Sequence, residues 1–121
     1  MTTIALFGAA GKMGTRIANK LRDDTEYRML YVEAGAAGLA RLREAGLTPT
    51  SKEEAAREAD VVILAVPDAV LGSVAAGIVP SLKSGAMVIC LDPAAPYAGE
   101  LLAREDISYF VTHPCHPPPG Q

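Results

Sequence analysis

The sequence has no tryptophan, few other aromatic residues, two cysteines and two histidines. A core built from this chain must therefore be aliphatic. Half of the 121 residues are hydrophobic, which is enough for one compact domain. No apolar run reaches the roughly 20 residues that a membrane-spanning helix needs, and the first residues lack the basic and apolar segments of a signal peptide. We therefore expect a cytoplasmic protein without a membrane partner.

An excess of positive charge is also missing. Eleven Lys and Arg residues face fourteen Asp and Glu residues, for a formal net charge of −3. Because nucleic-acid-binding domains present a basic face, we expect no nucleic-acid partner. Two cysteines, Cys90 and Cys115, do not indicate a disulfide framework, and reduced thiols agree with the cytoplasm.

Strand and helix patterns alternate along the chain. Short apolar runs predict strands over residues 3–7, 27–32, 61–66, 87–91 and 107–111, and intervening patterns predict helices over residues 12–22, 35–45, 52–59, 69–79 and 97–104. Residues 47–50 contain Pro49, which cannot donate to a central ladder, so this segment is an edge strand or a loop. Gly46 is placed to end one helix, and Ser51 with Glu54 forms a capping box for the next.

This alternation predicts an α/β fold of the Rossmann type: a doubly wound parallel sheet with helices on both faces. With the segment at Pro49 counted as third, the expected strand order is 3-2-1-4-5-6. The strand order then reverses between the first and fourth strands. A ligand is expected at that point, at the carboxyl ends of the strands.

A glycine-rich loop follows the first predicted strand and opens the first helix. Gly8 permits a tight turn, Gly11 lets the backbone approach a pyrophosphate, and Gly14 lets the helix pack closely on the strand. The helix N-terminus would offer free N–H groups to the phosphates. The spacing departs from the commoner Gly-x-Gly-x-x-Gly, and a simple turn is the alternative. We expect a dinucleotide-binding loop that is also lined by Ala10, Lys12 and Met13.

Glu33 ends the second predicted strand, close to the distance from the glycines at which an acid binds the adenosine ribose. A carboxylate there accepts hydrogen bonds from the ribose hydroxyls and repels a 2′-phosphate. Residues 34–37 contain no lysine or arginine that would neutralise one. The sequence therefore predicts NAD rather than NADP as the cofactor, with a solvated acid at the strand end as the alternative.

Two proline-containing loops follow the fourth and fifth predicted strands. We expect Val66, Pro67 and Asp68 to flank the cofactor, and Pro93 and Ala94 to approach the nicotinamide. Asp68 is also a candidate N-cap of the next helix, which is the interpretation we prefer for its side chain.

The two histidines lie in a proline-rich segment after the last predicted strand. Because imidazole titrates near neutral pH, His113 and His116 are candidates to bind a substrate carboxylate or to move a proton during hydride transfer. The alternative is that His113 only caps the strand and that His116 is an exposed residue, so that neither takes part in the reaction. Three ligands within four residues, including Cys115, make poor tetrahedral geometry, so we predict no metal site.

Four segments together resemble a known superfamily: residues 8–14, 59–68, 92–99 and 113–118. They are similar to the NAD-binding half of enzymes related to 6-phosphogluconate and prephenate dehydrogenases. Within these, the segment His-Pro-Cys-His-Pro-Pro most resembles the D-apionate oxidoisomerase group. The resemblance implies an NAD-dependent oxidoreductase that acts on a small hydroxy or sugar acid.

The resemblance also implies a division of the chain. Residues 1–112 would form the dinucleotide-binding domain, and residues 113–121 would lead to a C-terminal substrate domain that this chain lacks. The full-length enzyme would be a homodimer, and this chain alone would be inactive. An enzyme similar to dihydrodipicolinate reductase or prephenate dehydrogenase, or a non-catalytic NAD-binding module, are the alternatives.

Overall fold

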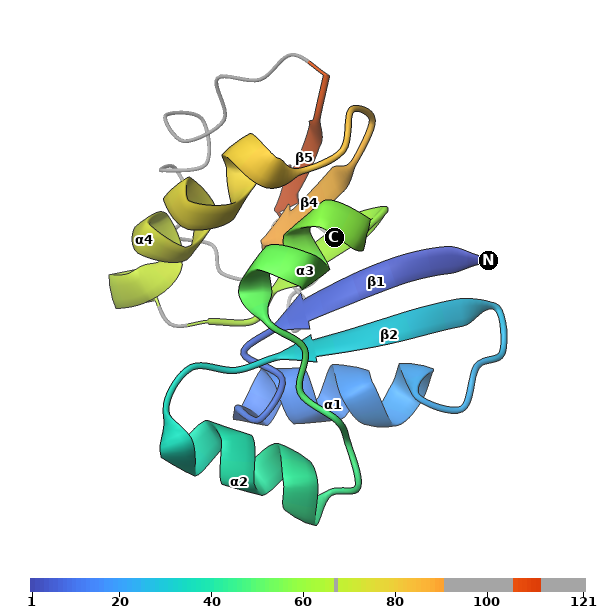
Figure 1. Cartoon of the computed structure of the whole chain (residues 1–121), viewed down its shortest axis with the longest axis vertical. Coiled ribbons are helices and arrows are strands. Elements are labelled where there is room, and N and C mark those ends of the chain that lie inside the picture. The colour runs from blue at the N-terminus through green and yellow to red at the C-terminus, as the bar shows by residue number, and fades with distance from the viewer. Residues whose placement is uncertain (67, 91–105, 112–121) are drawn as a thin grey trace, which may run out of the picture.

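A computed structural model describes residues 1–66, 68–90 and 106–111 of the chain (Figure 1). The strands are β1 (Thr2–Phe7), β2 (Tyr27–Val32), β3 (Val61–Leu64), β4 (Met87–Cys90) and β5 (Ser108–Val111). The helices are α1 (Lys12–Leu21), α2 (Ala36–Glu44), α3 (Lys52–Glu58) and α4 (Asp68–Ile78), followed by a short 3₁₀ helix, η1 (Val79–Ser81). The helix predicted over residues 97–104 lies outside the described residues.

The five strands form one parallel sheet in the order β2-β1-β3-β4-β5. Beyond β2, Pro49 makes a single parallel bridge to Tyr31. The bridge occupies the edge position expected for the segment at residues 47–50, and no longer strand forms there because proline lacks the N–H that a ladder requires. The predicted Rossmann-type order is therefore confirmed over the described strands.

Both faces of the sheet are covered, as a doubly wound fold requires. On one face, Phe7, Val32 and Val62 belong to a buried cluster with Ala55 of α3 and Ile78 of α4. On the other face, Leu6 and Ile63 pack in a second cluster with Ala18 of α1 and Leu42 of α2. Successive residues of β1 and β3 thus point to opposite clusters, and both clusters are mainly aliphatic.

Local signals end α2 and begin α3 as predicted. Gly46 has a φ of +79°, and hydrogen bonds run from Gly46 N to the Arg43 oxygen (3.0 Å) and from Leu47 N to the Leu42 oxygen (2.8 Å). This is the Schellman arrangement, in which glycine adopts the left-handed conformation at low cost. At the start of α3, Ser51 Oγ accepts a hydrogen bond from Glu54 N at 3.2 Å.

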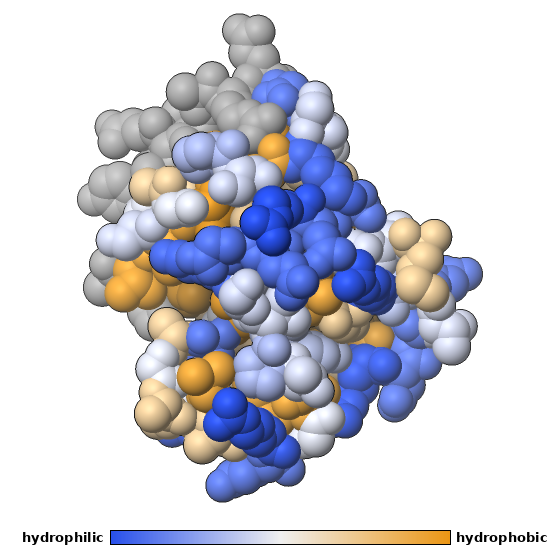
Figure 2. All heavy atoms as spheres, viewed as in Figure 1, coloured by the Kyte–Doolittle hydropathy of each residue, from blue (hydrophilic) through white to orange (hydrophobic). Residues whose placement is uncertain are grey.

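The outer surface of α3 is hydrophilic. Figure 2 shows hydrophilic residues gathered over this helix, where Lys52, Glu53, Glu54 and Arg57 are exposed. An ion pair between Arg28 Nη1 of β2 and Glu58 Oε1 of α3, 2.9 Å long, joins the helix to the sheet. Within the described part of the chain, no helix is long and apolar enough to cross a membrane.

Candidate functional site

The glycine loop lies at the carboxyl end of β1, between the ends of β2 and β3, where the strand order reverses. Gly8 N donates a hydrogen bond to the Val32 oxygen at the end of β2, 3.0 Å away. On its other side, a Cβ at Gly8 would collide with the backbone carbonyl oxygen of Ala65, which follows β3. Gly8 also has a φ of +81°. Its backbone angle and the closeness of Ala65 both require glycine at this turn.

The other two glycines of the motif have different surroundings. A Cβ at Gly14 would collide with the Gly8 oxygen and would lie 2.8 Å from the Ala9 Cα, so the close packing of α1 on the loop depends on this glycine. Among the described residues, a Cβ at Gly11 would meet only the Gly8 oxygen, at 3.4 Å. Packing within this part of the chain therefore does not require glycine at position 11, which lines the open pocket beside the loop.

No side chain caps the N-terminus of α1, which begins directly after Gly11. A helix N-terminus carries unsatisfied N–H groups and a partial positive charge, and it therefore attracts anions such as phosphates. Together with the bare backbone at Gly11, this arrangement fits the pyrophosphate of a dinucleotide.

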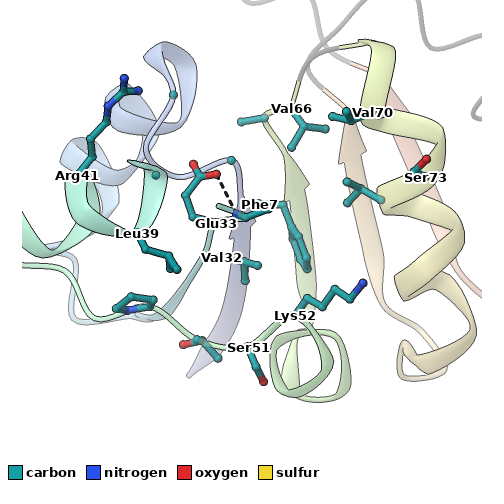
Figure 3. Close-up of a pocket in the computed structure, with 18 residues that line it drawn as sticks. Phe7, Val32, Glu33, Leu39, Arg41, Ser51, Lys52, Val66, Val70 and Ser73 are labelled. Carbon is teal, nitrogen blue, oxygen red and sulfur yellow. Dashed lines mark hydrogen bonds between the residues drawn. The ribbon is translucent and has the colours of Figure 1, made fainter. Parts of the chain in front are cut away.

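Glu33 lies against the loop, directly after β2. Its Oε2 accepts a hydrogen bond from Ala10 N at 2.9 Å, and its Oε1 accepts one from Ala34 N at 3.1 Å, the bond drawn in Figure 3. Helix α2 passes beside the same carboxylate, where Gly38 has no side chain to displace it. The predicted acid therefore lies between the glycine loop and the start of α2.

A pocket of about 850 Å³ opens at this edge of the sheet, within the size range of small-molecule and cofactor sites. Its apolar lining comes from three directions: Phe7 and Val32 from β1 and β2, Leu39 from α2, and Val66, Val70 and Val74 from β3–α4. Figure 3 shows Glu33 between Leu39 and Arg41 on one side and Val66 and Val70 on the other. Apolar walls around one carboxylate suit a flat aromatic ring linked to a hydroxylated sugar.

Two basic side chains also line this pocket, Arg41 of α2 and Lys52 of α3. In Figure 3 they lie on different sides of Glu33. Neither forms an ion pair within the described part of the chain. Arg41 is a basic residue of the same helix as Gly38, three positions further along, and it lies beyond the segment 34–37, which contains no lysine or arginine.

The structure brings four of the predicted site residues together around this pocket: Gly8, Gly11, Glu33 and Val66. Ala10 lies beside them and donates its N–H to Glu33. Lys12, Met13 and Gly14 form the first turn of α1 and do not line the pocket, and Asp68 is the first residue of α4. The remaining predicted residues lie outside the described part of the chain: Pro67, Pro93, Ala94, His113 and His116.

Sequence reasoning missed the wall of the pocket that α2 and α4 provide. Val70 and Val74 are four residues apart and therefore share one face of α4. That spacing, directly after a buried strand, could have identified α4 as a wall of the pocket. Gly38 was also visible as a glycine inside a helix, where alanine is the better helix former.

Cys90 ends β4 at the same edge of the sheet and is buried. Burial raises the pKa of its thiol because the charged thiolate is poorly solvated there. A thiol that stays protonated is a weak nucleophile, so Cys90 has a packing role in this sheet.

The sequence profile of the family described as "NADP oxidoreductase coenzyme F420-dependent" matches residues 3–95. The chain belongs to this family. The matched residues contain the glycine loop, Glu33 and, apart from Thr2 at the start of β1, every described element except β5. Family membership and the Rossmann-type sheet agree with the superfamily resemblance expected from the sequence.

Individual relatives are more specific. A D-apionate oxidoisomerase from Rhizobium rhizogenes is 55% identical over 119 residues, which are 98% of this chain and 43% of that protein. A solved structure from Cupriavidus necator, described as a semialdehyde dehydrogenase NAD-binding protein in complex with calcium and NAD, has a TM-score of 0.85 at 51% identity. The similarity covers the whole of this chain and 44% of the Cupriavidus necator chain. A putative oxidoreductase from Jannaschia sp. is similar over 99% of this chain and 43% of its own, with a TM-score of 0.83 and 44% identity. The chain thus spans under half the length of these relatives.

Proposed function

We propose that this chain is the NAD-binding part of an oxidoreductase. The observation that carries the proposal is the position of Glu33, which lies beside the glycine loop at the opening of an apolar pocket. A ribose acid, a phosphate loop and a ring-sized apolar space are the three features that a dinucleotide needs. The NAD-bound structure of a relative at 51% identity supports the same conclusion.

In this proposal, Gly8, Gly11 and the N-terminus of α1 hold the pyrophosphate, with Ala10, Lys12, Met13 and Gly14 shaping the loop. Glu33 accepts hydrogen bonds from the adenosine ribose. The adenine lies against the other valines of the pocket, and Val66, Pro67, Asp68, Pro93 and Ala94 flank the rest of the coenzyme. When bound, the nicotinamide supplies the hydride chemistry, and the protein orients it.

Glu33 favours NAD over NADP. Its carboxylate is held in place by two backbone N–H groups, so it does not readily turn away from a 2′-phosphate. The negative charges of the Glu33 carboxylate and of a 2′-phosphate on the neighbouring ribose would repel each other strongly in a partly buried site. Arg41 and Lys52 line the same pocket, and their positive charges act against this preference because they attract a 2′-phosphate.

For the whole protein we propose an activity like that of the D-apionate oxidoisomerases, with a small hydroxy or sugar acid as substrate. The identity of the Rhizobium rhizogenes relative supports this substrate class. Residues 1–112 would be the coenzyme domain, and residues 113–121 would lead into a substrate domain. His113 and His116 would contact the substrate there, in a cytoplasmic homodimer.

Calorimetric titration of the 121-residue chain with NAD and, separately, NADP tests the proposal. We expect NAD to bind more tightly and Glu33→Ala to weaken NAD binding. Glu26→Ala is the matched control, since Glu26 is an exposed residue that precedes β2, at the opposite end of that strand. A folded chain that binds neither coenzyme, or an equal loss in both variants, would contradict the proposal.

The histidines need a separate test, in a protein of the relatives' length. We expect His113→Gln or His116→Gln to lower kcat for sugar-acid oxidation while NAD affinity stays unchanged. Unchanged kcat in both variants would remove the two histidines from the proposed site.

A further inference from the structure

Gly38 makes room for the side chain of Glu33. A Cβ at Gly38 would lie 2.5 Å from Glu33 Cγ, 2.7 Å from Cδ and 3.0 Å from Oε1. Contacts this short are not tolerated, so any side chain at position 38 would push the carboxylate away. Gly72, a glycine inside α4, has no atom of the described residues within 4 Å of its Cβ position. The close approach at Gly38 is therefore specific and does not arise from helix geometry alone.

The carboxylate that Gly38 admits is bound to the glycine loop. Ala10 N, which donates to Glu33 Oε2 at 2.9 Å, lies in the loop between Gly8 and Gly11, and both of these glycines line the pocket. Oε1 accepts from Ala34 N at 3.1 Å. The bond from Ala10 N connects the end of β2 with the middle of the loop, across 23 residues of sequence. The bond from Ala34 N is local and holds the other carboxylate oxygen.

We propose that Gly38 is a positioning residue for the coenzyme: by leaving space on α2, it keeps Glu33 on the Ala10 N–H and so sets the ribose acid and the phosphate loop together. The inference rests on the proposed function. A carboxylate has about four acceptor positions, so Glu33 can retain its two backbone donors and still accept from ribose hydroxyls. The two halves of the nucleotide site are then aligned before the coenzyme arrives, which lowers the cost of binding.

Gly38→Ala separates this role from a purely structural one. Alanine is a better helix former than glycine, so α2 itself gains from the substitution. The same methyl group displaces Glu33 from Ala10. We expect the chain to remain folded and its NAD affinity to fall by roughly tenfold or more, the size of a lost hydrogen bond to a charged group.

The first measurement uses the chain without coenzyme. Amide hydrogen exchange by NMR should show the Ala10 N–H protected in the unmodified chain and in Gly72→Ala, and exchanging faster in Gly38→Ala and Glu33→Ala. Equal protection of Ala10 in the unmodified chain and in Gly38→Ala would overturn the inference, whether or not NAD binds.

The second measurement is a double-mutant cycle of NAD affinity. If Gly38 acts through Glu33, Gly38→Ala weakens binding in the unmodified chain and has no further effect in the Glu33→Ala background. An equal loss in both backgrounds, or no loss in either, would overturn the inference. If the unmodified chain binds no NAD at all, the proposed function fails, and the exchange of Ala10 still decides whether Gly38 positions Glu33.

Discussion

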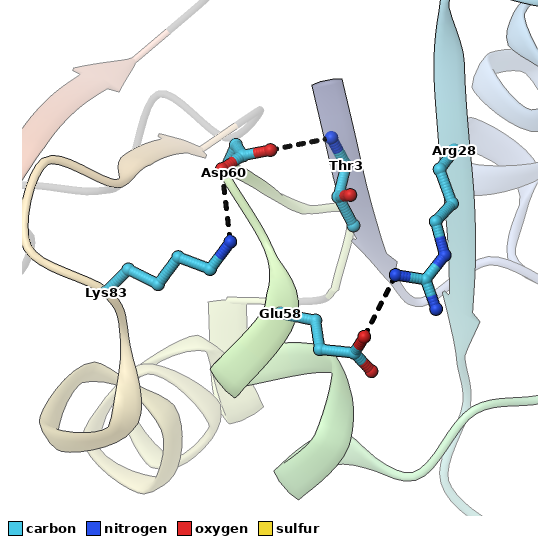
Figure 4. A network of polar contacts seen from close by, with 5 residues as sticks. All are labelled: Thr3, Arg28, Glu58, Asp60 and Lys83. Atoms are coloured by element: carbon cyan, nitrogen blue, oxygen red, sulfur yellow. Dashed lines mark hydrogen bonds and ion pairs between the residues drawn. The ribbon is translucent and has the colours of Figure 1, made fainter. Parts of the chain in front are cut away.

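Asp60 and Thr3 are joined by a pair of hydrogen bonds across 57 residues of sequence, and the one made by the Asp60 carboxylate is drawn in Figure 4. Asp60 Oδ2 accepts from Thr3 N at 2.9 Å, and Asp60 N donates to the Thr3 oxygen at 2.8 Å. The other carboxylate oxygen, Oδ1, lies 3.3 Å from Lys83 Nζ. Asp60 therefore ties together the amino ends of β1 and β3 and the turn before β4, at the end of the sheet opposite the candidate site.

This arrangement predicts an acid-sensitive contribution to stability. The hydrogen bond from Thr3 N, followed by the contact with Lys83, holds the pKa of Asp60 below its ordinary value. A lowered pKa in the folded state stabilises the protein above the unfolded value of about 3.9 and loses that effect as the pH falls through the folded value. Because the Asp60 side chain is 45% exposed, we expect it to contribute under about 1 kcal/mol to the free energy of unfolding.

Urea unfolding at pH 5 and pH 3 measures this contribution. Asp60→Asn keeps the size of the side chain and an acceptor for Thr3 N but removes the titration, so its stability should fall less between the two pH values. Asp23→Asn, at an exposed position, is the control. The same acid loss in Asp60→Asn as in the unmodified chain would contradict the assignment.

Gly14→Ala should destabilise the fold although it lies in a helix. Alanine normally gains up to about 1 kcal/mol over glycine there, but its Cβ would collide with the loop at Gly8. We expect a net loss of roughly 1–3 kcal/mol, as for an overpacked core. Thermal unfolding measures the loss. Gly72→Ala, whose Cβ would meet no atom of the described residues within 4 Å, should be neutral or stabilising. A stabilised Gly14→Ala would show that α1 does not need this close approach.

Gly46→Ala tests the backbone conformation alone. The residue has a φ of +79°, and the nearest atom of the described residues to a Cβ there is Arg22 Nη2 at 3.7 Å, which is ordinary contact. The cost should therefore be the left-handed penalty of about 1–2 kcal/mol. Gly46→Asn should lose less in the same denaturation measurement, because asparagine tolerates this conformation. Equal losses in both variants would point to sterics instead of backbone angle.

Cys90 should react slowly in the folded protein. Its side chain is buried, and burial raises the pKa of the thiol, so little thiolate is present and reagents do not reach it. In a Cys115→Ser background, alkylation at pH 8 should be slow without urea and fast with it. Rapid alkylation of the folded chain would mean that the Cys90 thiol at the end of β4 is accessible to the reagent, which would contradict the prediction.

Much of the fold follows from local patterns. The β-branched run that contains β3 could be recognised because a strand covered on both faces must be apolar throughout. Ser51 and Gly46 mark helix ends because their effects depend only on the backbone within a few residues. Glu33 was predicted as the acid at the end of β2 from its distance to the glycine loop, and the structure places it beside that loop.

Residue types and spacings along the chain were enough to predict the alternation of strands and helices, the turn at Gly8 and the acid at Glu33. The hydrogen bond between Glu33 and Ala10 N, the space that Gly38 leaves for Glu33 and the bonds between Asp60 and Thr3 became visible only in the folded chain. These contacts connect residues brought together by the crossovers between strands. Their distances depend on how whole helices pack on the sheet, which no local pattern of residues records.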